Sequence, residues 1–480
     1  MASAQAAPSE LLSSIFKLTL NQPPSRLHTS QLLAQHRARV GMLVKLSLVC
    51  KKWRSTVLGD GTLWETLPVH MSRADCQEST TTVLERSKRT MLDVSIIWED
   101  DLDSPCEAIF SKISKNFDRI KSLHFVTASP GTLHNLCTPA PNLEMLEIFT
   151  AEQPTELELL FGGNLPALQS LALAGLPSWP LGLFSNLKDL CLVLPPSNPT
   201  VKVSSLIDVM SRSPGLKQIK MSGFLSLDHD SPPSSLVRLP NLRKLTMHDC
   251  DSATVLSHTI IPAAANIKII IDHRRMRTAM HLPSRDCHIL SSVPENMSTL
   301  GFLTESAMFV LRQNREAGFG IGFYQSRSSL PSLRVLDLSA SVGPFARRSI
   351  EVLASHQQHF RNIKDLSVVL SAGAAVQWSR LLHGFRRLER LSVAAHHASS
   401  ILSALVVLGQ DSRPICPALR QLDIREKGCD TIALDRERMV EFFTARTVLH
   451  CSTAEVTIHW SGGRKTWKCR ALGGRTVVKY

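Results

Sequence analysis

The sequence is poor in aromatic residues and has no cysteine pattern of a disulfide or metal site. Aromatic residues make up 5% of the 480 residues, with only two tyrosines. The eleven cysteines are an odd number, and none forms a C-x-x-C pair. We therefore expect reduced thiols that act as small apolar side chains, as in cytoplasmic or nuclear proteins. The longest apolar runs, such as 401–408, are far shorter than a membrane span, and residues 1–5 do not resemble a secretory signal.

Motifs that carry catalytic or metal chemistry are also missing. The sequence contains neither a G-x-S-x-G nor an H-E-x-x-H motif. The pairs His356/His359 and His396/His397 have no cysteines or carboxylates at ligand spacing. The glycine-rich stretch 318–322 lacks the Lys-Ser/Thr of a phosphate-binding loop, so we predict a flexible loop between repeats there. We expect a non-catalytic protein that uses no cofactor and no metal.

Acidic residues are fewer than basic residues. The chain has 54 Lys and Arg against 41 Asp and Glu, a net charge of +13. Residues 461–480 hold six basic residues and no acidic one, and we predict a basic C-terminal cap or tail there. Basic chains can bind nucleic acid or anionic membranes. No stripe that combines aromatic and basic residues is present, so we expect neither nucleic acid nor a membrane as partner.

One phrase recurs along most of the chain: proline, any residue, leucine, two residues, leucine or isoleucine, one residue, then an apolar residue. Its six nearly unchanged copies lie at 141–148, 166–173, 214–221, 240–247, 331–338 and 417–424. Looser copies without the proline begin at Ile120, Leu187, Ile363 and Leu388. The last two apolar positions alternate, as in a short strand with one buried face. The L-x-x-L-x-L phrase at steps of roughly 20–30 residues is the leucine-rich-repeat signature.

Helix-like stretches separate the predicted strands. They lie at 204–210, 348–353, 376–385, 400–408 and 437–445. One such unit cannot bury its apolar edge alone, so neighbouring units stack. We predict an α/β fold, an irregular leucine-rich-repeat solenoid with a curved parallel sheet over residues 105–460. The alternative is an irregular α/β domain with coincidental leucines.

The polar positions that flank the inward apolar residues of each strand would line the concave face of this sheet. The mixed polar array suits a protein or peptide ligand, and it names no particular ligand. The candidate substrate-binding residues are Glu147, Lys220, Lys244, His248, Asp337, Asp365, Arg390, Asp423 and Arg425.

The first 70 residues have a different pattern, that of short amphipathic helices. Proline fits the first helical position, which Pro8 would occupy, and Glu10 would lie in the first turn, where the helix dipole favours an acid. The apolar residues at 11, 12, 15 and 16 recur at helical spacing. A second stripe is predicted at 46, 49, 50 and 53. Two short helices cannot build a large core, so apolar surface should remain for another chain or the following domain.

The order of these elements resembles the F-box. The family pattern runs Pro-x-Glu-Leu-Leu, then Ile, then Val-Cys-basic-x-Trp-basic, then Leu-Trp about ten residues later. Here it is carried by Pro8, Glu10, Leu11, Leu12, Ile15, Val49, Cys50, Lys51, Trp53, Arg54, Leu63 and Trp64. The stretch 84–96 looks like the connector of fungal-type F-box-like proteins. The sequence departs from the pattern at Ala7, where the family usually has leucine, and in a long basic loop from Leu20 to Arg39.

The resemblance implies a partner protein. F-boxes dock by apolar helix faces on the Skp adaptor, and through it on a cullin, in Skp–cullin–F-box (SCF) ubiquitin ligases. The implied docking or module-core residues are Pro8, Leu11, Leu12, Ile15, Phe16, Leu48, Val49 and Trp53. A substrate-recognition subunit for ubiquitin-dependent protein degradation in the cytoplasm or nucleus is therefore expected.

The expected domain order is an F-box-like module at 1–70, a connector at 71–104, the solenoid at 105–460 and the basic cap or tail at 461–480. Three alternatives stay open at this point. One is a leucine-rich-repeat scaffold with no ligase role, one is an ordinary small helical domain at the N-terminus, and one is an unrecognised enzyme of the α/β class.

Overall fold

The computed structural model places most of the chain in two units. It describes residues 7–20, 29–71, 75–98, 106–128, 130–150, 160–175, 184–194, 202–223, 236–249, 252–262, 264–271, 308–314, 318–324, 333–337, 351, 353, 362–370, 376–409, 412–425, 436–449, 451, 455–460, 463–472 and 475–479. The first unit comprises Met1–Leu216 with Phe224–Asp230, and the second comprises Lys217–Gly223 with Ser231–Tyr480. We describe each unit by itself.

The first unit begins with helices. These are α2 (Ser9–Leu20), α3 (Thr29–Ser47), α4 (Lys51–Gly59) and the short 3₁₀ helix η1 (Gly61–Trp64). Helix α3 begins inside the stretch that was predicted as a loop up to Arg39, so that prediction is wrong from residue 29 onward.

The predicted second helix is wrong in a similar way, because its apolar stripe is divided between α3 and α4. Cys50 has extended backbone angles and acts as the N-cap of α4, where its thiol accepts a hydrogen bond from the amide of Trp53 at 3.4 Å. Serine, threonine and aspartate are the usual residues at such a cap, so the sequence carried no strong signal for a helix start here.

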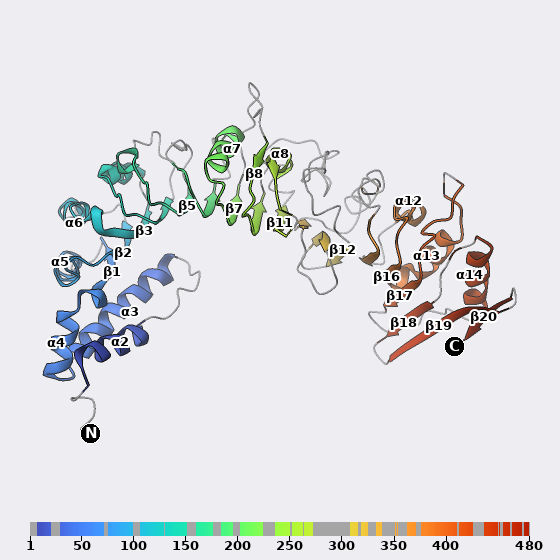
Figure 1. Ribbon diagram of the computed structural model, residues 1–480, viewed down its shortest axis with the longest axis horizontal. Coiled ribbons are helices and arrows are strands. Elements are labelled where there is room, and N and C mark those ends of the chain that lie inside the picture. Colours follow the sequence, from blue (N-terminus) through green and yellow to red (C-terminus); the bar gives the residue numbers. More distant parts are fainter. Residues whose placement is uncertain are drawn as a thin grey trace. The chain divides into compact units, whose positions relative to one another are not determined.

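A parallel sheet follows in the first unit (Figure 1). Its strands are β1 (Thr66–His70), β2 (Leu92–Trp98), β3 (Ile120–Thr127), β4 (Met145–Thr150), β5 (Ser170–Ala174) and β6 (Asp189–Val193), each parallel to the next. Helical segments connect or follow them: α5 (Cys76–Arg86), α6 (Cys106–Ser114), η2 (Phe117–Arg119), η3 (Pro130–Cys137), η4 (Leu160–Gly163) and α7 (Val203–Arg212). The predicted α/β class with a parallel sheet is confirmed.

Strand register explains the repeated leucine phrase. The first apolar strand positions lie side by side in the order Leu67, Val94, Leu123, Leu146, Leu171 and Leu190. All of these side chains are at most 2% exposed. Each repeat therefore buries its apolar residue against the equivalent residue of its neighbours. The sheet begins at Thr66, within the range predicted as a helical module, and β2 lies within the predicted connector.

The second unit has the same parallel arrangement with an antiparallel pair inserted. Strands β7 (Gln218–Ser222), β9 (Lys244–His248), β11 (Asn266–Ile271) and β14 (Leu333–Asp337) are parallel neighbours. Strands β15 (Asp365–Val369), β16 (Arg390–Ala394), β17 (Gln421–Arg425) and β18 (Glu455–Trp460) form a second parallel run. The short strands β8 (Val237–Arg238) and β10 (Thr259–Ile260) pair separately. The described helical segments of this unit are α8 (Ser252–Ser257), α12 (Trp378–His383), η9 (Ala395–His397), α13 (Ala398–Leu405) and α14 (Arg436–Val448).

The prediction of a flexible loop at the glycine-rich stretch 318–322 is wrong, because this stretch is part of a strand. Residues Gly318–Tyr324 form β13, which runs antiparallel to β14 on one side and to β12 (Met308–Asn314) on the other. Main-chain hydrogen bonds on both edges compensate for the low strand propensity of glycine. At the end of the chain, β19 (Gly463–Leu472) and β20 (Arg475–Lys479) extend the sheet from β18 as antiparallel strands.

A buried arginine fastens the helical layer near this end of the second unit. The guanidinium of Arg446 on α14 donates hydrogen bonds to the carbonyl oxygens of Leu405, Ile415 and Cys416 at 3.1, 2.7 and 2.7 Å. Burial lowers the pKa of Arg446. The side chain thereby holds α14 against the end of α13 and against the loop at Ile415 and Cys416. None of the helices that the structure describes is long and apolar enough to cross a membrane.

Candidate protein-interaction site

Helix α2 carries two apolar stripes, and only one of them is buried. Leu12, Phe16 and Leu20 follow each other at four-residue steps and are buried against the rest of the module. Leu11, Ile15 and Leu18 follow at steps of four and three residues and are 57%, 52% and 78% exposed. Because both spacings keep residues on one helix face, the three exposed side chains form a continuous apolar stripe.

A second apolar feature lies in the turn between α3 and α4. Leu48 and Val49 are 67% and 59% exposed. Their amides donate to the carbonyls of Lys45 and Leu46 at 3.0 and 3.3 Å, so the turn continues the last turn of α3. The Nε atom of Arg54 donates to the carbonyl of Ser47 at 3.1 Å and closes the turn from the α4 side. The two side chains are therefore held at the surface by a defined backbone.

The core beneath these features is aromatic. The rings of Phe16 and Trp53 meet edge to face with centroids 5.0 Å apart. Trp64 is buried, and its Nε1 donates to the carbonyl of Val57 at 2.8 Å. The residues named by the F-box resemblance thus divide into two groups. Leu12 and Phe16 are buried and Trp53 is half-buried, whereas the exposed members are Pro8, Leu11, Ile15, Leu48 and Val49.

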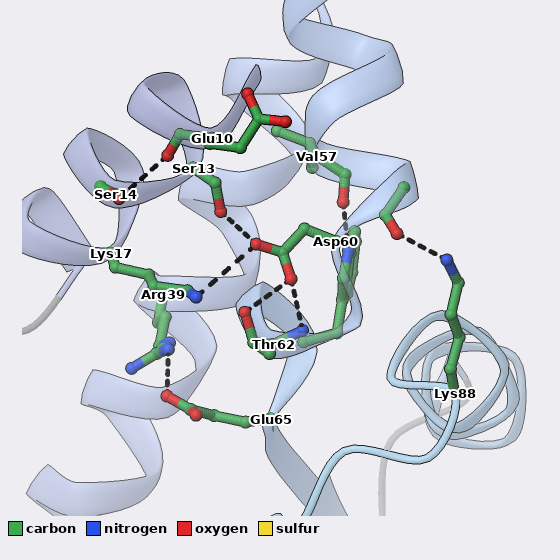
Figure 2. Close-up of polar contacts among 12 residues, drawn as sticks. Glu10, Ser13, Ser14, Lys17, Arg39, Val57, Asp60, Thr62, Glu65 and Lys88 are labelled. Atoms are coloured by element: carbon green, nitrogen blue, oxygen red, sulfur yellow. Dashed lines mark hydrogen bonds and ion pairs between the residues drawn. The ribbon is translucent and has the colours of Figure 1, made fainter. Parts of the chain in front are cut away.

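Asp60 joins α2 to the corner where α4 ends (Figure 2). One carboxylate oxygen accepts a hydrogen bond from the Ser13 hydroxyl and lies 3.7 Å from Nζ of Lys17. The other accepts from the amide and hydroxyl of Thr62 at 2.9 and 2.6 Å. Burial alone would raise the pKa of Asp60, but the hydrogen bonds from Ser13 and Thr62 and the charge of Lys17 lower it. The ionised carboxylate fixes the angle at which α2 lies on the module.

Helix α3 connects the module to the sheet of the first unit. The guanidinium of Arg39 lies 2.6 Å from a carboxylate oxygen of Glu65, just before β1, as Figure 2 shows. Three residues earlier on α3, Nδ1 of His36 is 2.9 Å from the hydroxyl of Ser95 on β2. Trp98 is three residues after Ser95 and so belongs to the opposite sheet face, where its ring centroid is 5.9 Å from that of Phe110 on α6. Helices α3 and α6 therefore cover opposite faces of the first strands.

His36 is the most strongly perturbed titratable group of this contact. The pKa of His36 is lowered to about 4, mainly by burial and further by the positive charge of Arg39 and by His124. The imidazole is therefore neutral at physiological pH and can accept the Ser95 hydrogen bond. Protonation would place a positive charge in this buried contact beside Arg39, so the folded chain favours the neutral form.

The predicted sheet-face residues are spread over both units. Glu147 is half-buried, with an oxygen 2.6 Å from Nδ1 of His124. Asp365 and Arg390 come together, with an oxygen and Nε 3.7 Å apart. Of the others, Lys220, Lys244 and Arg425 are exposed and His248 is half-buried. The side chain of Asp337 lies outside the described residues.

The burial of Asp423 contradicts one prediction for this face. It was expected to be exposed, but it is buried, and its carboxylate accepts a hydrogen bond from Nε2 of Gln421 at 3.0 Å. Strand register places Asp423 between Ser392 and Thr457, so neighbouring strands flank it on both sides. A ligand on the surface would not reach its carboxylate without a rearrangement.

Several residues of the site were missed from the sequence. Leu18 follows Leu11 by seven residues, so helical periodicity could have identified it. Ser13 and His36 gave no signal, because their partners, Asp60 and Ser95, are 47 and 59 residues away. Asp60 caps η1 through Thr62, a local contact that does not indicate its contact with α2. A scan against models of known protein families gave no match, and neither did a search of curated proteins. The functional argument therefore depends on these residues and their geometry.

Proposed function

We propose that this protein is the substrate-recognition subunit of an SCF ubiquitin ligase. Its N-terminal helices would form an F-box that docks on the Skp adaptor. The leucine-patterned strands would belong to a leucine-rich-repeat solenoid whose sheet face binds the target protein. The single observation that carries the proposal is the exposed stripe of Leu11, Ile15 and Leu18 on a helix whose other stripe is buried. Such a stripe requires a partner, because exposed apolar patches on soluble domains mark interaction sites.

The charges around the stripe and the turn indicate the chemistry of the partner. The basic residues Lys45, Lys51, Lys52 and Arg54 surround Leu48 and Val49 in the sequence, whereas Glu10 is the one acidic residue of α2. Such an interface favours an apolar groove with an acidic rim, because complementary charges at the rim accelerate association and exclude unsuitable partners. These features support an adaptor of the Skp type, whose place in the ligase the F-box resemblance implies.

The contacts of α3 fit the mechanism of such a subunit. A ligase adaptor works by proximity, since it holds a substrate lysine near a charged ubiquitin-conjugating enzyme and so raises the effective concentration. This advantage falls when the docking module and the substrate-binding surface move independently. Arg39–Glu65 and His36–Ser95 join the helical module to the first strands of the same unit.

The proposal is tested with the full-length chain and a purified Skp adaptor. The double variant Leu11→Ala and Ile15→Ala keeps a helix-forming residue at both positions. A fully buried leucine or isoleucine contributes about 1.5–3 kcal/mol, so we expect the dissociation constant to rise by at least roughly tenfold. Isothermal titration calorimetry measures the change. The matched control is Leu236→Ala with Val407→Ala, two exposed apolar residues of the second unit, which should leave the constant within about twofold.

The test has a clear negative outcome. If the unaltered chain does not bind the adaptor, the ligase role is wrong and a scaffold that uses only the sheet face replaces it. Affinity purification followed by mass spectrometry provides the second readout. It should recover the adaptor and a cullin with the unaltered chain, and lose both with the double variant while retaining proteins bound to the sheet face.

A further inference from the structure

The sheet face of three adjacent strands in the second unit carries a group of positive charges. Strand register aligns Lys220 on β7, Thr246 on β9 and Lys268 on β11 in one row. Lys244 lies two residues before Thr246 on the same face of the middle strand, and His248 lies two residues after it. We call Lys220, Lys244, Lys268 and His248 the lysine face.

The positive charge of this face is that of its three lysines, because the lowered pKa of His248 favours the neutral imidazole. Burial lowers the pKa of His248, and the charges of Lys268 and Lys220 lower it further, whereas only Asp249 opposes them. Among the residues that the structure describes, no carboxylate forms an ion pair with Lys220, Lys244 or Lys268. By contrast, Lys364 and Glu389 are 3.3 Å apart elsewhere in the same unit. The three lysines therefore present positive charge with which no described carboxylate forms an ion pair, while Asp249 lies close enough to act on His248.

The side chains between the charges indicate which kind of anion fits. The remaining face positions of these strands include Gln218, Ser222, Thr246 and Asn266, which offer hydrogen-bonding groups. The described face positions of β7, β9 and β11 contain no phenylalanine, tyrosine or tryptophan, and the half-buried imidazole of His248 is the one described ring there on which a base could stack, which is the usual source of single-strand affinity. A peptide, with its own amides and carbonyls, matches this surface better than a nucleic acid.

We propose that the lysine face binds an acidic segment of a protein, one that carries aspartate or glutamate at intervals along an extended stretch. Neighbouring strands lie about 4.8 Å apart, so the Cα atoms of Lys220 and Lys268 are separated by about 10 Å. An extended chain advances about 3.3 Å per residue and carries alternate side chains on one face, so carboxylates at two-residue spacing recur about every 6.6 Å, within reach of the long lysine side chains along this row. That the acidic segment belongs to a ligase substrate rests on the proposed function. That the lysine face binds an acidic peptide does not.

The experiment measures binding of short fluorescent peptides to the full-length chain by anisotropy. The acidic probe alternates aspartate and serine, the neutral probe alternates asparagine and serine, and a third probe is single-stranded oligothymidylate of similar charge. The variant is Lys220→Gln with Lys244→Gln and Lys268→Gln. The control variant is Lys115→Gln with Lys121→Gln and Lys364→Gln, which removes the same total charge from exposed positions outside the lysine face.

We expect the unaltered chain to bind the acidic probe, with an affinity that falls as salt rises. The lysine-face variant should lose at least roughly tenfold in affinity and the control variant less than about twofold. Lys220 and Lys244 are exposed, so the single variants Lys220→Gln and Lys244→Gln provide folded proteins if the triple variant does not fold. Circular dichroism checks the fold of each.

Three results would overturn the inference. The first is no binding of the acidic probe, and the second is an equal loss in both triple variants, which would assign the effect to net charge. The third is tighter lysine-face-dependent binding of the oligothymidylate, which would make the surface a nucleic-acid site. Adaptor binding is measured on the same proteins. If the unaltered chain binds the adaptor but not the acidic probe, this inference alone is contradicted. If it binds the acidic probe through the lysine face but not the adaptor, the proposed function alone is contradicted.

Discussion

The strands of the first unit bury all of their aligned apolar residues, whereas α2 buries one of its two apolar stripes and exposes the other, although both patterns recur with regular spacing. The aligned strand residues from Leu67 to Leu190 are all buried, because each strand has a neighbouring repeat that covers it. Helix α2 packs against α4 and η1, and only the stripe that faces them is buried. Regular apolar spacing therefore predicts the type of element. The number of neighbouring elements decides how much of the apolar surface is covered.

The largest effect that tests this comparison is expected in the sheet. Leu146→Ala removes a fully buried side chain from the middle of the aligned row, and such substitutions cost about 2–5 kcal/mol. Leu18→Ala, on the exposed stripe of α2, should change the free energy of unfolding by less than about 0.5 kcal/mol. Urea denaturation measures both. Equal costs would show that the two sets of leucines are not distinguished by burial.

The contact between α3 and the sheet should make stability depend on pH. In the unfolded chain His36 gains a proton below its ordinary pKa of 6.5, but in the folded chain it does so only below about 4. The free energy of unfolding should therefore fall as the pH falls from 6.5 to 4, by at most about 3 kcal/mol from this residue. His36→Gln should remove this contribution. A pH profile of unfolding that is the same for both proteins would contradict the burial of a neutral His36.

A smaller effect is expected at the corner that positions α2. Asp60→Ala removes the acceptor of the Ser13 and Thr62 hydrogen bonds and should cost about 1–2 kcal/mol. Asp118→Ala, an exposed carboxylate in η2, is the matched control and should have little effect. Thermal denaturation compares the two. Asp60→Ala should also weaken adaptor binding, since the apolar stripe of α2 would lose its fixed angle.

The smallest effect on stability is expected where the effect on binding is largest. Leu11→Ala with Ile15→Ala should change the free energy of unfolding by no more than about 0.5 kcal/mol, because both side chains are exposed in the free protein. The same variant should lose adaptor binding. A large loss of stability would show that these residues pack within the chain. They would then not form a docking surface.

The repeat strands could be predicted from the sequence, whereas the boundaries of the N-terminal helices and the inserted strand could not. The proline-led phrase predicted β4, β5, β7, β9, β14 and β17, because strand burial depends on a pattern within a few residues. The division of Leu46–Trp53 between two helices was not predicted, since Cys50 is an unusual cap. The strand at Gly318–Tyr324 was not predicted either, because its partners lie on two other strands.

The sequence by itself determined where the proline-led phrases form strands, that their apolar residues alternate inward, and that an amphipathic helix follows Pro8. Only the tertiary structure decided that Phe16 is core while Ile15 is exposed, that Asp423 is buried, and that Lys220 and Lys268 share one row. Local spacing fixes the direction of a side chain relative to its own element. Burial and charge clustering depend on which other elements come next to it, and those contacts join residues far apart in the chain.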